Sequence, residues 1–314
     1  MAFEINYTDR YLNYNQVLKN EFSERIQKIS LNAGFTCPNR DGSRGLGGCT
    51  YCNNQSFSPE YCKPTKSITQ QLQEGIDFFR HKYDAQLYLA YFQAYTNTYD
   101  SIENLKRLYE EALSHPKVVG IVIGTRPDCV SDELLDYFAE LNSRCYLMIE
   151  YGIESTSDKT LQFINRGHDY ACAEKAIRAT AARGIRTGAH LILGLPHESR
   201  SIILGHAKRI SELPLTAIKL HQLQLVKGTK MAKQYTEHPE WFRLYTADEY
   251  IDLVIDFIEM LNPAIAIERM ISQSPPGFVI APDWGLKNFE FIVKVEKRMV
   301  QRNTRQGSRY VPSR

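Results

Sequence analysis

Residues 118–128 read VVGIVIGTRPD, in which an apolar run rich in β-branched side chains is followed at once by a polar turn motif. Such a run is typical of a strand buried on both faces of a parallel sheet. The same pattern predicts five more strands, at Ile26–Ser30, Gln86–Phe92, Cys145–Ile149, Arg186–Leu193 and Thr216–Leu220. Amphipathic helical patterns alternate with the strands, at Ile68–Lys82, Ser101–Ser114, Asp132–Asn142, Asp158–Ile164, Tyr170–Arg183 and Ser201–Glu212.

This alternation of strands and helices implies parallel pairing through helical crossovers. Six strand–helix units are too few for the closed eight-fold barrel, so we predict an α/β fold of the partial, open TIM-type barrel class. Ser131 is the expected N-cap of one helix, and Gly184 the expected C-cap of another.

We expect the core to span residues 25–230, with an N-terminal extension over 1–24 and a C-terminal α/β extension over 231–314. Within the C-terminal extension the pattern predicts a helix at Thr246–Leu261, a possible edge strand at Ala264–Ile267 and a turn at SPPGF, residues 274–278.

Polar motifs follow nearly every predicted strand. They are QAYTNTY (93–99), GTRPD (124–128), YGIES (151–155) with NRGH (165–168), GLPHE (194–198) after a strand that carries His190, and KLHQLQLVKGT (219–229). The ends of parallel strands meet at one edge of the sheet, where barrel enzymes carry their active sites. Any one motif could be a simple turn, but the set favours an enzyme over a scaffold. Tyr99, His221 and Asp283 are interpreted as structural.

Three cysteines, Cys37, Cys49 and Cys52, stand in the glycine-rich stretch CPNRDGSRGLGGCTYC, residues 37–52. Three thiolates complete neither a tetrahedral zinc site nor a four-thiolate cluster, so a cubane held by them has one iron open for chemistry. A Cys-x-x-Cys pair also suits a redox dithiol or half of a zinc knuckle. No residue at zinc-finger spacing supplies a fourth ligand, and Cys62 is the nearest candidate. The cysteines therefore favour an iron–sulfur site.

Composition limits the setting. An odd number of cysteines, seven, and a polar start without an apolar run predict a reduced cytoplasmic protein without disulfides. No stretch approaches the length of a membrane span. The net charge of +2 conceals an asymmetry, because residues 294–314 carry seven Lys and Arg against one Glu. Such a basic tail suits a phosphate backbone, and a solvated chain end is the alternative.

These motifs resemble the radical S-adenosylmethionine (SAM) superfamily. The resemblance lies in the three cysteines with Tyr51, in TRPD, in the GIES and NRGH block and in HLILGLP, and it points to the branch of the elongator-type catalytic subunit and the coproporphyrinogen dehydrogenases. SLNAGFTCPNRDG and YFQAYTNTY are similar to a narrower bacterial family of about three hundred residues that modifies the wobble uridine of tRNA. The cysteine loop of eleven residues departs from the three found in many superfamily members.

The resemblance implies two cofactors. Cys37, Cys49 and Cys52 would bind a [4Fe-4S] cluster, whose fourth iron is chelated by SAM, and electron transfer from the cluster would release a deoxyadenosyl radical that abstracts hydrogen from the substrate. The expected SAM contacts are Gln93, Ala94 and Tyr95 near the amino group, Glu154 at the ribose, Arg166 at the carboxylate, and His190 and Val226 beside the ribose and adenine.

The narrower family implies a substrate as well. It converts carboxymethylaminomethyl-(2-thio)uridine at the tRNA wobble position to the aminomethyl form, and the candidate residues for the substrate carboxylate are Arg126, Lys219 and Lys227. The implied partners are the anticodon region of tRNA and an electron donor such as flavodoxin or ferredoxin. Two alternatives stay open: a radical SAM enzyme acting on a small molecule, and a non-catalytic zinc and RNA-binding module.

Overall fold

The structure is a computed structural model that describes residues 10–54, 58–80, 87–275 and 277–312. Residues 1–9 of the N-terminal extension, Lys82, Gln86, Pro276 and residues 313–314 of the tail, all named above, lie outside the described residues.

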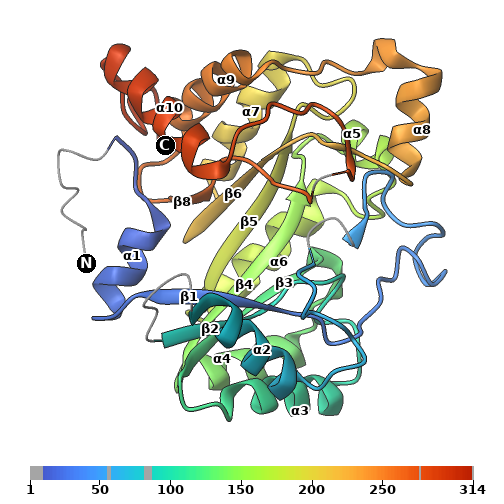
Figure 1. The fold of residues 1–314 in the computed structure, drawn as a ribbon, viewed down its shortest axis with the longest axis vertical. Helices are drawn as coiled ribbons and strands as arrows, with labels where there is room; N and C mark the ends of the chain where they lie inside the picture. The colour runs from blue at the N-terminus through green and yellow to red at the C-terminus, as the bar shows by residue number, and fades with distance from the viewer. Residues whose placement is uncertain (1–9, 55–57, 81–86, 276, 313–314) are drawn as a thin grey trace.

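The described chain is organised around a seven-stranded sheet in the order β1-β2-β3-β4-β5-β6-β8, with every neighbouring pair parallel. The strands are β1 (Ile26–Leu31), β2 (Leu87–Phe92), β3 (Val118–Thr125), β4 (Tyr146–Glu154), β5 (Arg186–Leu193), β6 (Ala217–Gln222) and β8 (Ala266–Arg269). The sheet curls into a half-barrel (Figure 1), which confirms the predicted partial TIM-type barrel. Two short strands, β7 (Leu225–Val226) and β9 (Val279–Ala281), pair antiparallel beside it.

Helices connect the strands. They are α1 (Tyr14–Glu21), α2 (Ile68–Arg80), α3 (Ile102–Leu113), α4 (Asp132–Asn142), α5 (Asp158–Phe163), α6 (Tyr170–Ala182), α7 (Arg200–Ser211), α8 (Lys230–Glu237), α9 (Ala247–Met260) and α10 (Asn288–Gln301), with 3-10 turns η2 (Pro127–Cys129) and η3 (Pro239–Trp241). Ser131 caps α4 by accepting from the backbone N–H of Leu134, as predicted. The C-cap of α6 is Arg183, and Gly184, the predicted C-cap, follows it with a φ of +73°.

Strand β4 shows how the sheet separates two environments. Leu147, Ile149, Tyr151 and Ile153 belong to the main core under the outer helices, while Tyr146 and Met148 belong to a second apolar cluster on the concave side. β4 continues to Glu154, five residues beyond the predicted end at Ile149, because the strand stays buried on both faces through Ile153 of the YGIE motif.

Helix α1 covers the concave side near the start of the strands. The hydroxyl of Tyr14 lies 2.6 Å from that of Tyr146 and donates to the sulfur of Met148 at 3.2 Å. Asn13 pairs with Ile267 of β8, so the segment before α1 extends the sheet edge. The described part of the N-terminal extension therefore covers the half-barrel near the start of the strands.

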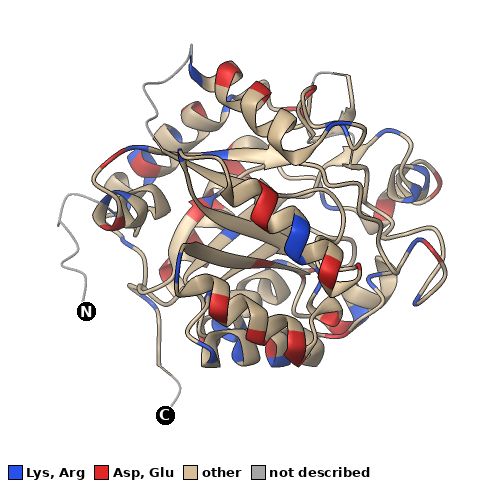
Figure 2. Ribbon diagram, turned by 90° about the horizontal axis from the view of Figure 1, so that it is seen from below, with Lys and Arg blue, Asp and Glu red and all other residues tan. Residues whose placement is uncertain are grey.

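The basic C-terminal segment is engaged by α9. Arg298 contacts Asp248 and Asp252, and Arg302 contacts Asp252 and Asp256, at 2.5–3.3 Å. Figure 2 shows acidic and basic residues interspersed along the outer helices. Much of the positive charge predicted to favour a phosphate backbone is thus used to hold α10 against α9. None of the helices in the described residues is both long enough and apolar enough to cross a membrane.

Candidate functional site

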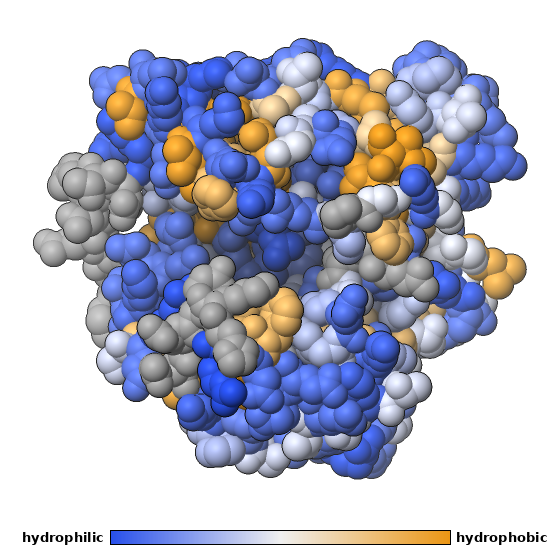
Figure 3. Space-filling view, viewed as in Figure 1, coloured by the Kyte–Doolittle hydropathy of each residue, from blue (hydrophilic) through white to orange (hydrophobic). Residues whose placement is uncertain are grey.

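A single pocket collects the polar motifs from the carboxyl ends of the strands. Figure 3, which has the view of Figure 1, shows a hollow with a hydrophilic floor in the middle of the molecule. Of the residues predicted from the sequence, the pocket is lined by Cys37, Cys49, Cys52, Gln93, Tyr95, Arg126, Glu154, Arg166, His190, Lys219 and Val226. Ala94 is buried behind the lining, and Lys227 lies in an adjoining depression with Gly228 and Phe278. Most of the candidates, whether taken from the cysteine motif or from the family resemblance, therefore line one pocket.

The three cysteines lie together on one side of this pocket, and each sulfur has its own polar neighbour. Nη1 of Arg126 lies 3.9 Å from Sγ of Cys37, and Nη1 of Arg166 lies 3.5 Å from Sγ of Cys49. The amide of Asn54 lies 3.6 Å from Sγ of Cys52. Two guanidinium groups therefore face thiols that become anionic when they bind metal.

The long loop between Cys37 and Cys49 is held by other site motifs. The amide of Asn165 donates to the backbone carbonyls of Leu46 and Gly48, and Arg44 pairs with Asp128 at 3.4 Å. Inside the loop, Asn39 donates to the carbonyl of Asn165. The eleven-residue loop is thus anchored to both NRGH and TRPD, which gives its extra length a structural role.

All seven cysteines of the chain are available as free thiols. Burial and the nearby Cys49 raise the pKa of Cys52 to about 12, against the opposing effect of Arg166 and Arg40. The described residues contain no group of three His, Cys, Asp or Glu side chains gathered around one metal position. In a cubane each thiolate binds a different iron, so the sulfurs need not meet at one point.

A bulge in β4 shapes the middle of the pocket. The register of β4 with β5 shifts between Gly152 and Glu154, and Glu154 has a φ of +70°. Such bulges re-aim side chains beside active sites. Here Nη2 of Arg166 donates to the carbonyl of Gly152 at 2.6 Å and lies 3.8 Å from Oε1 of Glu154. Nε of Arg166 is buried without a hydrogen-bond partner in the described structure, so this guanidinium keeps a donor for a ligand.

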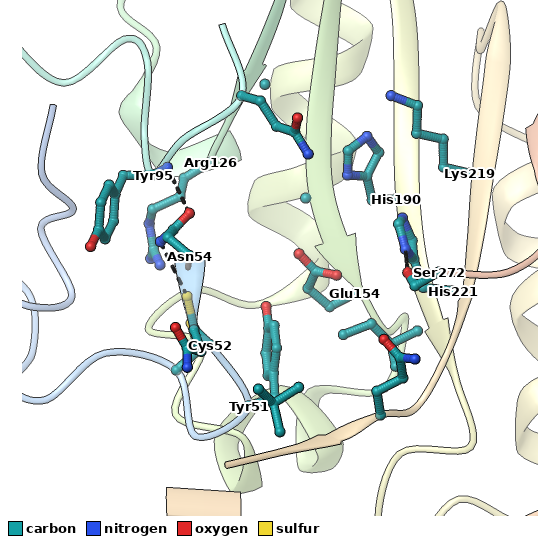
Figure 4. Close-up of a pocket in the computed structure, with 18 of the residues that line it drawn as sticks. Tyr51, Cys52, Asn54, Tyr95, Arg126, Glu154, His190, Lys219, His221 and Ser272 are labelled. Carbon is teal, nitrogen blue, oxygen red and sulfur yellow. Dashed lines mark hydrogen bonds between the residues drawn. The ribbon is translucent and has the colours of Figure 1, made fainter. Parts of the chain in front are cut away.

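The QAYTNTY motif forms the wall beside the cysteines. Gln93 accepts from the hydroxyl of Ser30 at 3.0 Å. Tyr95 has a φ of +62°, its backbone N–H donates to Asn54, and its ring lies under Arg40. A non-glycine residue in the left-handed region at a pocket wall is typical of a functional site. Figure 4 shows Tyr95, Asn54 and Cys52 on one side of the pocket and His190, Lys219 and His221 on the other, with Glu154 between them.

A buried charged network forms the floor. Glu150 accepts from Lys28 at 3.0 Å, from Lys219 at 2.6 Å and from His190 at 3.0 Å. Glu268 completes it, at 2.7 Å from Lys28 and 3.1 Å from Lys219. We refer to Lys28, Glu150, His190, Lys219 and Glu268 as the floor network.

Burial and the neighbouring charges shift the pKa values of residues in and beside the floor network. Burial opposes ionisation of Glu150, but Lys219 and Lys28 outweigh it and hold the pKa of that carboxyl well below its usual range. Burial lowers the pKa of Lys219 despite Glu150 and Glu268. Burial together with His190 holds the pKa of His221 well below 6.5, so its imidazole is neutral at physiological pH.

The three candidates for a substrate carboxylate lie in different surroundings. Arg126 uses both sides of its guanidinium on Asp128, at 2.9 Å each. Lys219 is committed to the floor network, and Lys227 is exposed outside the main pocket. The sequence analysis missed Lys28, Glu150 and Glu268, and it treated His221 as structural although His221 lines the pocket. The charge of Glu150 inside the apolar run YLMIEYGI was the available signal.

The chain belongs to the radical SAM superfamily, which its residues 35–210 match. Residues 215–301 match the radical SAM C-terminal domain. The chain is 36% identical over 302 residues to the uncharacterized protein YtqA of Bacillus subtilis, covering 96% of this chain and 93% of that protein. It is 24% identical over 191 residues to the tRNA uridine(34) acetyltransferase of Dehalococcoides mccartyi, covering 60% of this chain but 39% of that protein.

Among solved structures, the archaeal Elp3 of Methanocaldococcus infernus with an N-terminal deletion superposes with a TM-score of 0.70 at 15% identity. The match covers 90% of this chain and 64% of the archaeal chain, and it shows a shared fold.

The protein is therefore a radical SAM enzyme, and members of this superfamily bind a [4Fe-4S] cluster and SAM. The pocket fits both groups, because it combines three free thiols beside two guanidinium groups with a buried, unpaired N–H of Arg166.

Proposed function

We propose that this enzyme removes the carboxymethyl group from carboxymethylaminomethyl-(2-thio)uridine at the wobble position of tRNA, leaving aminomethyl-(2-thio)uridine. The observation that carries the proposal is the pocket itself, in which three cysteines share one cavity with a charged floor. The kinship with a tRNA uridine(34) acetyltransferase supports a wobble uridine as the substrate. YtqA, which matches over nearly its whole length, carries no assigned activity.

In the proposal Cys37, Cys49 and Cys52 hold the cluster. Arg166 pairs with the carboxylate of SAM through its free Nε, and Glu154 bonds the ribose. A forked guanidinium is the side chain best suited to a carboxylate.

The remaining SAM contacts are assigned by position. Gln93 and the backbone around Ala94 and Tyr95 face the amino group, and Val226 lies on the adenine side. His190 is oriented by its hydrogen bond to Glu150, which presents its ring edge to the ribose.

When bound, the cluster and SAM supply a one-electron cleavage that yields a hydrogen-abstracting carbon radical. Together the two groups would serve as a two-electron oxidant of the substrate, converting the amine of the carboxymethylaminomethyl group to an imine at the carbon beside nitrogen. Addition of water then splits the C–N bond, giving the aminomethyl group and glyoxylate. The chain's own contribution is to hold the substrate carbon against SAM and to exclude water until the hydrogen has moved, which the closed floor of the half-barrel favours.

Nucleoside mass spectrometry of bulk tRNA from cells with and without the gene tests the proposed substrate. We expect carboxymethylaminomethyl-uridines to accumulate and aminomethyl species to fall when the gene is deleted. Complementation with Cys49→Ala should fail, and complementation with Cys172→Ala, which changes a cysteine of α6, should succeed. An unchanged set of wobble nucleosides would rule out the tRNA substrate.

The same reaction in vitro separates the alternatives. Reduced, reconstituted enzyme should form deoxyadenosine and glyoxylate together when the modified tRNA is present, with flavodoxin or ferredoxin as the proposed cytoplasmic electron donor. A small-molecule enzyme would form deoxyadenosine without acting on tRNA. A zinc and RNA-binding module would carry zinc and neither iron nor sulfide after purification without oxygen.

A further inference from the structure

Two cations that line the pocket have no carboxylate partner among the described residues, Arg40 and Arg269. Arg40 lies over the ring of Tyr95 on the cysteine side, whereas Arg269 lies beside the floor network. Arg269 ends β8 and lines the pocket, yet it forms no ion pair within the described part of the chain. The remaining three pocket cations each have a carboxylate neighbour: Arg126 pairs with Asp128, Arg166 lies next to Glu154, and Lys219 belongs to the floor network.

A bulge at the end of the sheet places Arg269 in this position. The register of β8 with β6 shifts so that Ile218 faces Ile267 while Lys219 faces Arg269. Two consecutive residues thereby reach the concave side, with Glu268 bonded to both lysines of the floor network and Arg269 beside them in the cavity. Without the bulge, successive side chains would point to opposite faces of the sheet.

No carboxylate of the floor network is left to neutralise the positive charge of Arg269. Lys28 and Lys219 share the carboxylates of Glu150 and Glu268, so the two acids are matched by two lysines and Arg269 adds one positive charge. Next to it, Nε2 of His221 is buried without a partner in the described structure, while its other ring nitrogen is bonded to Ser272. A partly buried cation that lacks an anion is most stable when a ligand supplies one.

We propose that Arg269 binds the carboxylate of the substrate side chain and so positions the carbon that loses hydrogen. This inference rests on the proposed function and deepens it. The guanidinium fork matches a carboxylate with two parallel hydrogen bonds, and the reacting carbon is bonded directly to that carboxylate. Fixing the carboxylate therefore fixes the reacting C–H on the side of the pocket opposite the cysteines, where Figure 4 places His221 and Ser272.

The test compares two anticodon stem-loops that differ only in the carboxylate. One carries carboxymethylaminomethyl-uridine and the other aminomethyl-uridine at the wobble position. Their dissociation constants are measured by fluorescence anisotropy on reconstituted enzyme with SAM, for the wild type, Arg269→Gln, Arg269→Lys and Arg107→Gln. Arg107 lies on the outer helix α3 with its side chain 63% exposed, so it controls for loss of an arginine.

The wild type and Arg107→Gln should bind the carboxylate-bearing stem-loop about tenfold more tightly, the worth of one charge-assisted hydrogen-bonded pair. Arg269→Gln should bind both alike, and Arg269→Lys should recover part of the difference. Equal binding by the wild type, or a preference kept by Arg269→Gln, would overturn the role of Arg269. A wild type that shows the preference but does not convert the stem-loop supports Arg269 and refutes the proposed reaction.

Discussion

The ammonium group of Lys28 lies 2.7 Å from the carboxylate of Glu268, although the two residues belong to the two edge strands of the sheet, β1 and β8. The pair crosses the interior of the half-barrel and links strands that share no backbone hydrogen bonds. Both side chains are largely buried, at 16% and 13% exposure. In a closed barrel, backbone hydrogen bonds join the first and the last strand. In this open barrel, the ion pair between Lys28 and Glu268 joins the two edge strands instead.

Removing one partner of this pair should destabilise the fold. Glu268→Gln leaves Lys28 and Lys219 sharing the single carboxylate of Glu150, and an uncompensated buried charge costs about 3 kcal/mol. Urea unfolding followed by circular dichroism measures the loss. The control is Glu237→Gln, which breaks an exposed pair with Lys233 and should cost under about 0.5 kcal/mol. Equal midpoints for the two variants would contradict a closing role for the pair.

Acid should weaken the fold through a partly buried histidine, His168. Burial and the neighbouring Arg166 lower the pKa of His168 from 6.5 to about 3. Between these values the unfolded chain binds a proton that the folded chain does not, so stability falls as the pH falls through this range. One such group contributes a slope of up to about 1.4 kcal/mol per pH unit.

The measurement is the free energy of unfolding at several pH values from 7 to 4. His168→Gln should flatten the curve over this interval, whereas His115→Gln, in the turn before β3, should leave its slope as in the wild type. A slope that His168→Gln does not change would show that other groups cause the acid sensitivity.

The cluster ligands are predicted to differ from the remaining cysteines. Alanine at Cys37, Cys49 or Cys52 should abolish the visible absorbance of the reconstituted cluster and reduce bound iron, because each thiolate holds a separate iron. Cys62→Ala should retain both, since this thiol donates to the carbonyl of Ser30 and does not line the pocket. Iron and sulfide analysis of anaerobically reconstituted variants measures the loss. An equal loss of iron in Cys62→Ala would contradict the assignment of the three ligands.

The sequence predicted the strands, the helices and the motifs at strand ends, which depend on residues close together in the chain. It did not predict the floor network, which is formed by residues far apart in the chain. Strands and helices followed from runs of a few residues, and the site motifs followed from their place at strand ends. Lys28 and Glu268 stand 240 positions apart, and no local pattern indicates that they meet. Arg269 reaches the pocket through a bulge, which reverses the side-chain alternation that a regular strand would predict. The extra length of the cysteine loop became understandable only when Asn165 was found to hold it.

The C-terminal segment contains two kinds of basic residue with different expected roles. Arg298 and Arg302 hold α9, so their replacement by glutamine should lower the melting temperature. Lys294, Lys297 and Arg305 are exposed and form no ion pair within the described residues. If they contact tRNA, replacing all three with glutamine should weaken binding and reduce the slope of log affinity against log salt by up to about three. An unchanged slope of log affinity against log salt would show that these three residues do not contact tRNA.

A methyl group at Gly152 should separate SAM binding from cluster binding. A Cβ there would lie 2.6 Å from Oε1 of Glu154 and 2.8 Å from Nη2 of Arg166. Arg166 has little room to retreat, because it is buried and donates to the carbonyl of Gly152 and to Cys49. Gly152→Ala should therefore raise the KM for SAM by about tenfold, the worth of one charge-assisted hydrogen bond, and leave the iron content intact.

The matched control is Gly205→Ala in α7, where an added Cβ meets no atom within 4 Å. This change should leave the KM for SAM unaltered and stabilise the helix by about 0.5–1 kcal/mol. Loss of iron from Gly152→Ala would mean that Arg166 supports the cluster through Cys49 more than it binds SAM. An unchanged KM would remove Arg166 from the SAM site, because the clash displaces its guanidinium while the thiols keep their positions.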